Sequence, residues 1–252
     1  MCRITNQILE SLYRRKSVRV FTDQPIVQTE KDAIIKAAMQ APSAGNQALY
    51  TILDITDPML KEKLSVTCDN QPFIAKAPLV LIFLADFRRW YDAFQYSGCE
   101  PRKPAEGDLL LAMADACIAA QNSVVAAESL GIGSCYIGDV LEQYEAHREL
   151  LCLPDYVFPA VMLVYGYPTE QQKRRKKPER FAQPYIVQEN TYRTFSPQEH
   201  EAFFREQAER EGKSSFDYPA FMQVFCKRKY NSDFSREMSR SVSLYMQQFQ
   251  RK

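Results

Sequence analysis

The feature of this sequence that most restricts its fold is a long apolar segment, residues 106–130. Between Leu109 and Leu130 the strongly polar residues are Asp115, Gln121, Asn122 and Glu128, and most of the others are Leu, Ala, Met, Cys or Val. A helix that is apolar over most of its circumference has to be buried. Its alanines allow a second helix to approach closely, and Gly131 provides a suitable C-cap. The segment therefore predicts a buried helix in the centre of the fold or at a subunit interface.

Shorter segments around this helix predict strands and further helices. Residues 50–56, 78–87 and 157–168 are predicted strands, and residues 131–140 a glycine-rich turn with a short strand. The uninterrupted apolar run 78–87 suits a strand covered on both faces, although a buried helix would show the same pattern. Helices are predicted over 4–13 and from a capping box of Thr29 and Asp32 to just before Ala41-Pro42. Two charged segments of the tail, 199–210 and 231–250, are helical candidates that need a partner surface.

The bulk composition predicts a soluble globular protein. The chain has 252 residues, 46% of them hydrophobic, and its 32 basic and 31 acidic residues leave a formal net charge of +1. This charge gives no global field for nonspecific binding to nucleic acid or to a membrane surface. The apolar runs 79–85 and 157–165 are far shorter than the roughly 20 residues of a membrane helix, and no signal-peptide pattern is visible. We therefore expect a cytoplasmic protein without a membrane partner.

Cysteine and histidine usage argues against disulfides and metal sites. The seven cysteines contain no C-x-x-C pair, and their odd number disfavours a disulfide framework. With only two histidines, no metal-ligand spacing is present. No nucleophile elbow or Ser/His/Asp set is visible either. Cys135, an isolated cysteine between apolar residues, is expected to be inert. If the protein is an enzyme, a cofactor carries the chemistry.

Two basic clusters are candidates for holding a phosphate. The stretch RRKSVRVF (14–21) combines four cations with a serine, and KRRKK (173–177) is followed by Arg180. A phosphate monoester has close to two negative charges and three acceptor oxygens, which several Arg, Lys and Ser donors can bind. Taken alone, each cluster also fits a solvated basic loop. A nucleic-acid surface would interleave aromatic residues or be net basic, so we expect no nucleic-acid partner.

Two loops next to predicted strands can approach a flat ligand. PSAGNQ (42–47) is polar, and GIGSCYIGDV (131–140) is rich in glycine. Backbone N–H groups at Gly131, Gly133 and Gly138 can bond the edge of a heterocycle, because glycine lets the main chain come close. Both loops can equally be simple turns, and neither matches a dinucleotide or P-loop motif.

Read together and in this order, these segments resemble the nitroreductase family of FMN-dependent NAD(P)H oxidoreductases. The matching stretches are RRKSVRVF, APSAGNQ, DNQPFIAKAPLVLIFLADF, AAESLGIGSCYIGDV and KKPERF followed by VQENTYR. They extend from Ile4 to Phe195 and look most like the larger, NADPH-preferring branch. The resemblance implies an α+β fold with a central, mostly antiparallel sheet flanked by helices. It also implies a domain-swapped homodimer with extended C-terminal helices, residues 1–195 forming the FMN-binding domain and 196–252 a helical extension of it.

The resemblance also assigns roles to residues at an FMN site between the subunits. Donors to the phosphate and ribityl chain would be Arg15, Lys16, Ser17, Arg19, Lys177 and Arg180. Groups at the polar edge of the flavin would be Gln71 and, from the partner chain, Ser43 and Asn46. Residues lining the ring would be Tyr136, Ile137, Gly138 and Asp139. The Gly138 N–H is the expected donor to N5, the atom that accepts the hydride, and Arg14 is expected to face water.

Three positions depart from the family pattern. The loop commonly reads N-x-Q-P-W, whereas here Asn46 is followed by Gln47, Ala48 and Leu49. The K-P-R of the related branch is replaced by KPER (177–180), with one extra residue. Asp139 stands where glycine is frequent, and its carboxylate should disfavour the anionic reduced flavin.

The implied activity is a ping-pong transfer of hydride from NAD(P)H through the flavin to nitroaromatics, quinones or free flavin. Candidate cations for the 2′-phosphate of NADPH are Lys213, Lys227, Arg228 and Lys229. The alternative from another class is a non-catalytic flavin-binding or electron-carrier protein.

Overall fold

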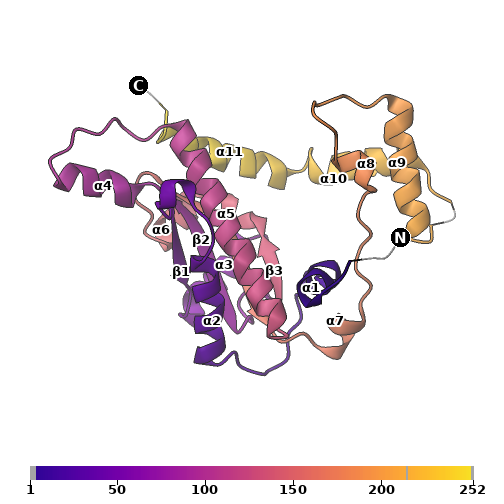
Figure 1. Cartoon of the computed structure of the whole chain (residues 1–252), viewed down its shortest axis with the longest axis horizontal. Coiled ribbons are helices and arrows are strands. Elements are labelled where there is room, and N and C mark those ends of the chain that lie inside the picture. Colours follow the sequence, from indigo (N-terminus) through magenta and orange to yellow (C-terminus); the bar gives the residue numbers. More distant parts are fainter. Residues whose placement is uncertain (1–3, 214, 251–252) are drawn as a thin grey trace. The chain divides into compact units, whose positions relative to one another are not determined.

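The structure is a computed structural model that describes residues 4–213 and 215–250. The chain divides into two compact units (Figure 1). The first unit contains the residues up to Arg175 together with those from Glu237 onward, and the second unit is Lys176–Arg236. The division expected at residue 195, with the tail as an extension of one domain, stays a prediction.

An antiparallel sheet forms the centre of the first unit. Within the described residues it has four strands: β1 (Tyr50–Asp54), β2 (Leu79–Asp86), β3 (Gly133–Ile137) and β4 (Val157–Gly166). Their spatial order is β1-β2-β4-β3, with Tyr50 opposite Ala85, Leu79 opposite Tyr165 and Gly133 opposite Gly166. Every residue of β2 is buried, so the apolar run 78–87 is a strand covered on both faces. The predicted α+β class with an antiparallel sheet is confirmed.

The long apolar segment is the central helix α5 (Glu106–Ser129), as predicted. It packs on β2 and β4, and α2 (Gln28–Met39) lies beside it (Figure 1). Ala112, Ala116, Ala119 and Ala120 of α5 are buried in the core, as close packing of a helix requires. Gly131 ends the helix with φ +75°, and the Ile132 N–H donates to the Ala127 carbonyl at 2.9 Å. By length and composition α5 could cross a membrane, but its buried Asp108 and Asp115 and its packing on the sheet identify it as a core helix.

Local signals explain where several other helices begin. Asn6 caps α1 (Gln7–Arg14) by accepting from the Leu9 N–H at 3.0 Å. The predicted capping box of Thr29 and Asp32 is wrong. Instead α2 begins one residue before Thr29, and Glu30 accepts from the Val27 N–H at 3.0 Å, because the acceptor has to lie three residues after the N-cap.

The remaining elements of the first unit are short connectors. The α-helices are α3 (Pro58–Thr67), α4 (Arg88–Tyr96), α6 (Tyr144–Leu150) and α7 (Glu170–Arg174), and the 3₁₀ turns are η1 (Ala44–Asn46) and η2 (Gly138–Leu141). The basic cluster expected as a loop is therefore partly helical, since Lys173 and Arg174 end α7.

The second unit is a set of helices around aromatic side chains. It contains α8 (Gln183–Ile186), α9 (Pro197–Arg210) and α10 (Tyr218–Lys229). Ser196 and Glu199 form the capping box of α9. Phe181 meets Phe204 with ring centroids 4.9 Å apart, and Tyr185 stacks on Phe195 at 5.3 Å. Helix α11 (Asp233–Gln247) starts in this unit and continues into the first unit at Glu237.

Candidate functional site

The first basic cluster lies directly beside β3. The Val18 N–H donates to the Ser134 carbonyl at 2.9 Å, and the Thr22 N–H donates to the Tyr167 carbonyl at 2.8 Å. A Cβ on Gly133 would come within 2.6 Å of Val18 Cγ2, closer than packed carbon atoms can approach. Glycine at position 133 therefore permits this contact. The structure thus brings together two stretches that are more than 110 residues apart, RRKSVRVF and GIGSCYIGDV.

Arg15 is the most informative side chain of this cluster. Its guanidinium carbon lies 5.8 Å from the centroid of the Tyr136 ring. Its Nε and Nη2 atoms are buried and have no hydrogen-bond partner among the described residues. A buried guanidinium nitrogen without an acceptor is costly, by about 1–3 kcal/mol or more. The position therefore suits a ligand that brings an anionic or strongly accepting group against the Tyr136 end of β3.

The other cations of the cluster have different surroundings. Lys16 donates through Nζ to the Lys173 carbonyl at 2.7 Å and also to the Arg175 carbonyl. Arg175 in turn donates to the Ser17 carbonyl. The end of α7 is therefore fastened to the first basic cluster. Arg14 is exposed, as expected. The sequence did not predict this role for Arg175, because the run of five cations at 173–177 does not show which of them faces the first basic cluster.

Arg19 points toward the turn that carries Gln71. Its guanidinium carbon lies 6.0 Å from the Phe73 ring centroid. The Gln71 side chain donates to the Cys68 carbonyl at 2.8 Å, which leaves its amide oxygen for another donor. Asp69 and Asn70 before it have positive φ angles of 59° and 51°. The turn thus carries both the half-buried amide of Gln71 and the Phe73 ring against which Arg19 lies.

The end of β3 offers an open backbone edge. Gly138 is exposed, and a Cβ added to it would meet no atom within 4 Å. Ile137 is buried, and the Tyr136 hydroxyl donates to Gln121 Oε1 at 3.1 Å. Burial raises the pKa of Tyr136 to about 12, so its hydroxyl remains protonated near neutral pH. The Cys135 thiol is buried, and this burial raises its pKa, as expected for an inert cysteine.

A buried carboxylate on α5 organises the loop that contains Ser43 and Asn46. Asp115 accepts from the Ala44 N–H at 3.0 Å through Oδ1 and from the Leu49 N–H at 3.1 Å through Oδ2. Ser43 Oγ accepts from the Ala48 N–H at 2.9 Å, whereas Asn46 is exposed with φ 56°. The sequence reading missed this positioning role, although a lone aspartate inside an apolar helix was the available signal.

A group of carboxylates lies where η2 ends. Glu142 is 5% exposed, and its Oε1 is buried without a hydrogen-bond partner among the described residues. Burial, followed by the negative charges of Asp139, Asp69 and Glu237, raises the pKa of Glu142 to about 7. Glu142 therefore holds its proton into the neutral range, a property that no sequence pattern indicated.

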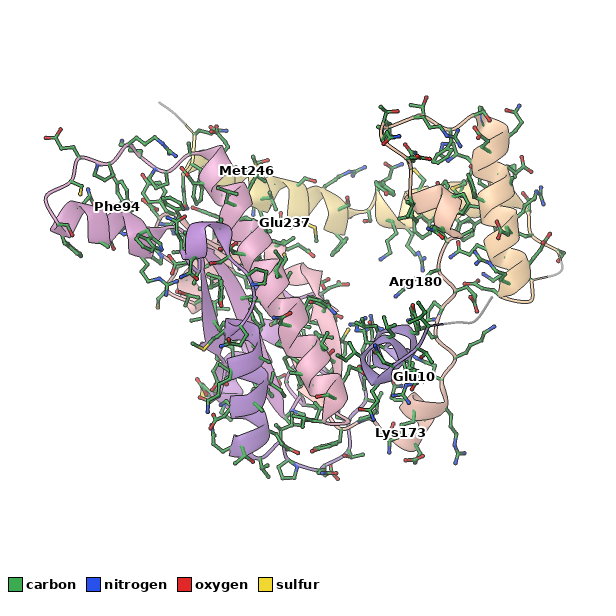
Figure 2. The ribbon with its side chains drawn as sticks, in the orientation of Figure 1. Glu10, Phe94, Lys173, Arg180, Glu237 and Met246 are labelled. Atoms are coloured by element: carbon green, nitrogen blue, oxygen red, sulfur yellow. The ribbon has the colours of Figure 1, made fainter. Side chains whose placement is uncertain are left out.

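Lys177 and Arg180 belong to the second unit. Figure 2 labels Arg180 in the connection between α7 and α8. Gln207 and Arg210 of α9 fix the backbone there by donating to the Glu179 carbonyl at 3.0 Å and to the Arg180 carbonyl at 2.9 Å. Their expected contact with the phosphate stays a prediction.

The residues of the first unit fit a ligand with an anionic group and a flat ring. The unpartnered nitrogens of Arg15 belong to a guanidinium that lies 5.8 Å from the Tyr136 ring, and the exposed Gly138 follows Tyr136 by two residues at the end of β3. Among the described residues, no cluster of three or more metal-ligating side chains is present.

Comparisons with known proteins agree with this arrangement. The sequence model of the Nitroreductase family matches residues 12–167. An FMN reductase (NADPH) of Bacillus subtilis (strain 168) is 34% identical over 189 residues, covering 74% of this chain and 75% of the relative. An oxygen-insensitive NADPH nitroreductase of Salmonella typhimurium is 34% identical over 184 residues, covering 73% and 74%. The solved structure of Bacillus megaterium NfrA2 superimposes with a TM-score of 0.83 at 28% identity, covering 98% of this chain and all of that one.

Proposed function

Because this chain belongs to the nitroreductase family, we propose that it is an NAD(P)H-dependent oxidoreductase with FMN as its cofactor. Bound FMN supplies a ring that accepts hydride at N5 and passes the electrons to a second substrate. NAD(P)H and the acceptor use one face of the site in turn, which is a ping-pong scheme. The acceptors are nitroaromatics, quinones or free flavin, and the protein works in the cytoplasm.

The main support for this proposal is Arg15, because two of its guanidinium nitrogens are buried without a hydrogen-bond partner among the described residues. Its buried Nε and Nη2 require an acceptor, and a phosphate supplies three oxygens with nearly two charges. Ser17 and Arg19 add donors from the same segment, and Lys16 adds its remaining N–H after the two carbonyl contacts. Lys177 and Arg180 are further candidate donors to the phosphate.

Residues at the end of β3 and in the turn that carries Gln71 would orient the flavin ring. Tyr136 and Ile137 would line the ring, and the Gly138 N–H would be the donor to N5. Gln71 would bond the polar edge through its amide. Asp139 places a negative charge near the flavin, which disfavours the reduced anion and lowers the flavin potential. These groups would position the reactants, and no side chain need act as an acid or base.

Apolar side chains left exposed on α1 and α5 support a homodimer. Ile8 and Leu12 of α1 are 62% and 40% exposed, and Leu110, Leu111 and Ile118 of α5 are 69%, 50% and 41% exposed. Exposed apolar patches of this kind mark protein interfaces. The dimer brings Ser43 and Asn46 of the partner chain to the flavin edge.

The cations proposed for the 2′-phosphate of NADPH lie in the second unit. Lys213 is paired with Glu211 at 2.6 Å, and Arg228 lies 5.7 Å from the Phe225 ring centroid. Lys227 and Lys229 lie in the same last turn of α10 as Arg228. All four remain candidates for the 2′-phosphate, three of them side by side on α10 and one already paired with a carboxylate.

Mixing with NADPH tests the function directly. The purified protein is expected to show flavin absorption bands near one FMN per chain, and the oxidised bands should bleach after stopped-flow mixing with NADPH. A subsequent mixing with a quinone should restore them. If the protein holds FMN but NADPH does not bleach it, the electron-carrier alternative holds instead.

A further inference from the structure

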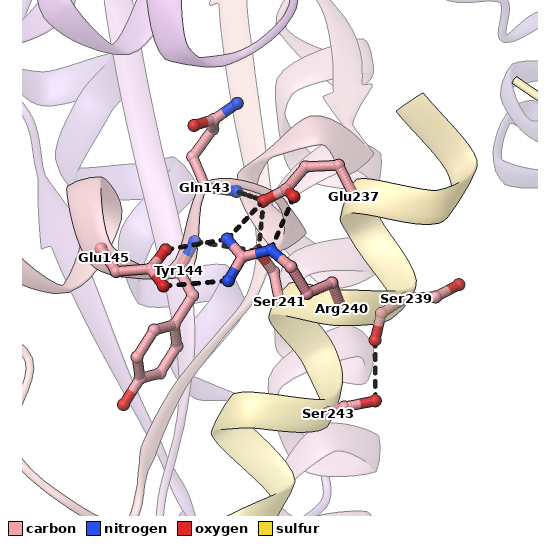
Figure 3. Close-up of polar contacts among 8 residues, drawn as sticks. All are labelled: Gln143, Tyr144, Glu145, Glu237, Ser239, Arg240, Ser241 and Ser243. Atoms are coloured by element: carbon pink, nitrogen blue, oxygen red, sulfur yellow. Dashed lines mark hydrogen bonds and ion pairs between the residues drawn. The ribbon is translucent and has the colours of Figure 1, made fainter. Parts of the chain in front are cut away.

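The turn that carries Gly138 is held in place by helix α11, about 95 residues later in the sequence. Helix α6 follows this turn, and its N-cap residue Gln143 makes no capping bond with its own side chain. The N–H groups at the start of α6 are bound by α11 instead (Figure 3). The Gln143 N–H donates to Glu237 Oε1 at 3.2 Å, and the Tyr144 N–H donates to Ser241 Oγ at 3.0 Å. Side chains about 95 residues away in sequence therefore replace the missing local cap.

Arg240 joins both sides of this contact. It donates to the two carboxylate oxygens of Glu145 at 2.9 and 2.8 Å, and it donates to Glu237 at 2.7 and 2.8 Å (Figure 3). Its hydrogen bonds are the largest cause that lowers the pKa of Glu237, to about 2. Glu237 is therefore charged throughout the neutral range, and bidentate pairing of this kind fixes geometry as well as charge.

Helix α11 is itself anchored in the core. Tyr245 is fully buried and meets Tyr144 and Phe158 with ring centroids 4.5 and 4.9 Å apart. Phe249 is 1% exposed and lies 5.5 Å from the Tyr156 ring centroid. These contacts tie α11 to β4, so the Arg240 network is built on a rigid base.

The chain between this network and Gly138 is very short. Turn η2 ends at Leu141, and only Glu142 separates it from Gln143. Gln143 has φ 53°, a left-handed conformation that a residue with a side chain holds only when its surroundings enforce it. Glu142 is buried, so this short connection cannot swing out freely. A displacement at Gln143 is thus transmitted to Gly138 and Asp139.

We infer that Arg240 and Glu237 are positioning residues for the flavin edge, acting through Gln143 on the Gly138–Leu141 turn. This inference rests on the proposed FMN function only for its consequence, the placement of the Gly138 N–H. The mechanical coupling itself is independent of any ligand. Small displacements of groups at a reacting centre lower rates strongly.

The test compares Arg240→Ala and Glu237→Gln with the matched control Arg236→Ala. Arg236 lies one turn earlier on α11 and pairs only weakly, at 3.4 Å, with the fully exposed Asp233. In both network variants we expect amide hydrogen exchange over residues 138–142 to be faster than in the wild type. With FMN bound, we expect the rate constant of flavin reduction by NADPH to fall about tenfold and the flavin midpoint potential to shift. Arg236→Ala should match the wild type in all three measurements.

The outcomes separate this inference from the proposed function. Wild-type protein that is not reduced by NADPH contradicts the function, and hydrogen exchange then still decides the coupling. Unchanged exchange over 138–142 in folded Glu237→Gln, the milder variant, overturns the inference. A lowered melting temperature with unchanged reduction rate and potential also overturns it, because that result describes a purely structural contact.

Discussion

At the scale of single residues, buried ionisable groups that lack hydrogen-bond partners or charge compensation mark the site. The buried nitrogens of Arg15 have no partner among the described residues, and the buried carboxyl of Glu142 is surrounded by other acids. Such groups are found more often at functional sites than in the rest of a protein. Both lie on segments that meet at β3 or follow it, so the unfavourable groups and the proposed FMN site coincide.

Removal of the Arg15 guanidinium should weaken FMN binding. A hydrogen bond to a charged group contributes about 1.5–3 kcal/mol, so Arg15→Ala should raise the Kd for FMN roughly 10- to 100-fold. The matched control is Arg14→Ala, since Arg14 is the exposed neighbour. Fluorescence titration of the flavin-free protein measures both. Equal affinities for the two variants would contradict the phosphate role.

The stability of the protein should depend on pH through Glu142. Its pKa is raised from the ordinary 4.5 to about 7 in the folded state, first by burial and then by neighbouring carboxylates. Below pH 4.5 the carboxyl is protonated in both states. Between pH 4.5 and 7 the unfolded chain loses the proton while the folded protein keeps it, and above pH 7 the folded protein carries a buried charge. Its destabilising effect therefore grows as pH rises.

Glu142→Gln removes this effect. We expect the variant to gain roughly 1–3 kcal/mol of unfolding free energy relative to the wild type between pH 5 and pH 8. Urea unfolding at the two pH values measures the change. Glu149→Gln, on the exposed side of α6, serves as control. A difference between Glu142→Gln and wild type that is the same at both pH values would refute this account.

At the scale of elements, the site depends on one close approach of backbone segments. The segment around Val18 can lie against β3 only because position 133 lacks a Cβ. The same applies where Phe21 covers Gly166, where a Cβ would come within 2.6 Å of the ring. The packing of Val18 on Gly133 and of Phe21 on Gly166 therefore positions the first basic cluster against the sheet.

Gly133→Ala should push the first basic cluster away from β3. The added methyl would overlap Val18, and overpacking of this kind costs about 1–3 kcal/mol. We expect a lower melting temperature and weaker FMN binding. Gly107→Ala is the control, because a Cβ there meets no atom within 4 Å and alanine favours the helix α5. If both variants bound FMN equally well, the packing of Val18 would not position the site.

At the scale of the whole molecule, the exposed apolar residues of α5 predict that one chain alone does not form the complete FMN site. Leu110 and Ile118 are 69% and 41% exposed, although ten of the 24 residues of α5 are buried. A partner chain would cover them and bring its Ser43 and Asn46 to the flavin edge. Dimerisation and FMN binding should therefore be linked.

Charges placed on α5 should separate the subunits. The double variant Leu110→Glu/Ile118→Glu is expected to elute as a monomer in size-exclusion chromatography with light scattering, and to lose FMN. Met59→Glu, at a 69% exposed position of α3, should remain a dimer. A monomeric wild type, or a monomeric variant that keeps full FMN affinity, would rule out a shared site.

The sequence alone determined the central helix, the strands of the sheet and the family. The apolar pattern predicted α5, and a strand was the preferred interpretation of residues 78–87 although a buried helix shows the same pattern. From the order of its motifs the sequence also identified the nitroreductase family, but it did not predict shorter helices such as α3, α4 and α6. It could not identify the partners of each polar group. Asp115 holding the 44–49 loop, Lys16 bound to the end of α7 and Arg240 bridging Glu145 and Glu237 all join residues far apart in the chain.

Only the tertiary structure decided which cations are compensated and which are left for a ligand. By charge alone, RRKSVRVF does not distinguish Arg14, Arg15, Lys16 and Arg19. Packing against β3 buries two nitrogens of Arg15, leaves Arg14 exposed and gives Lys16 two carbonyls. The free energy of a charged group depends on its burial and on acceptors contributed by distant segments, and these are properties of the folded chain.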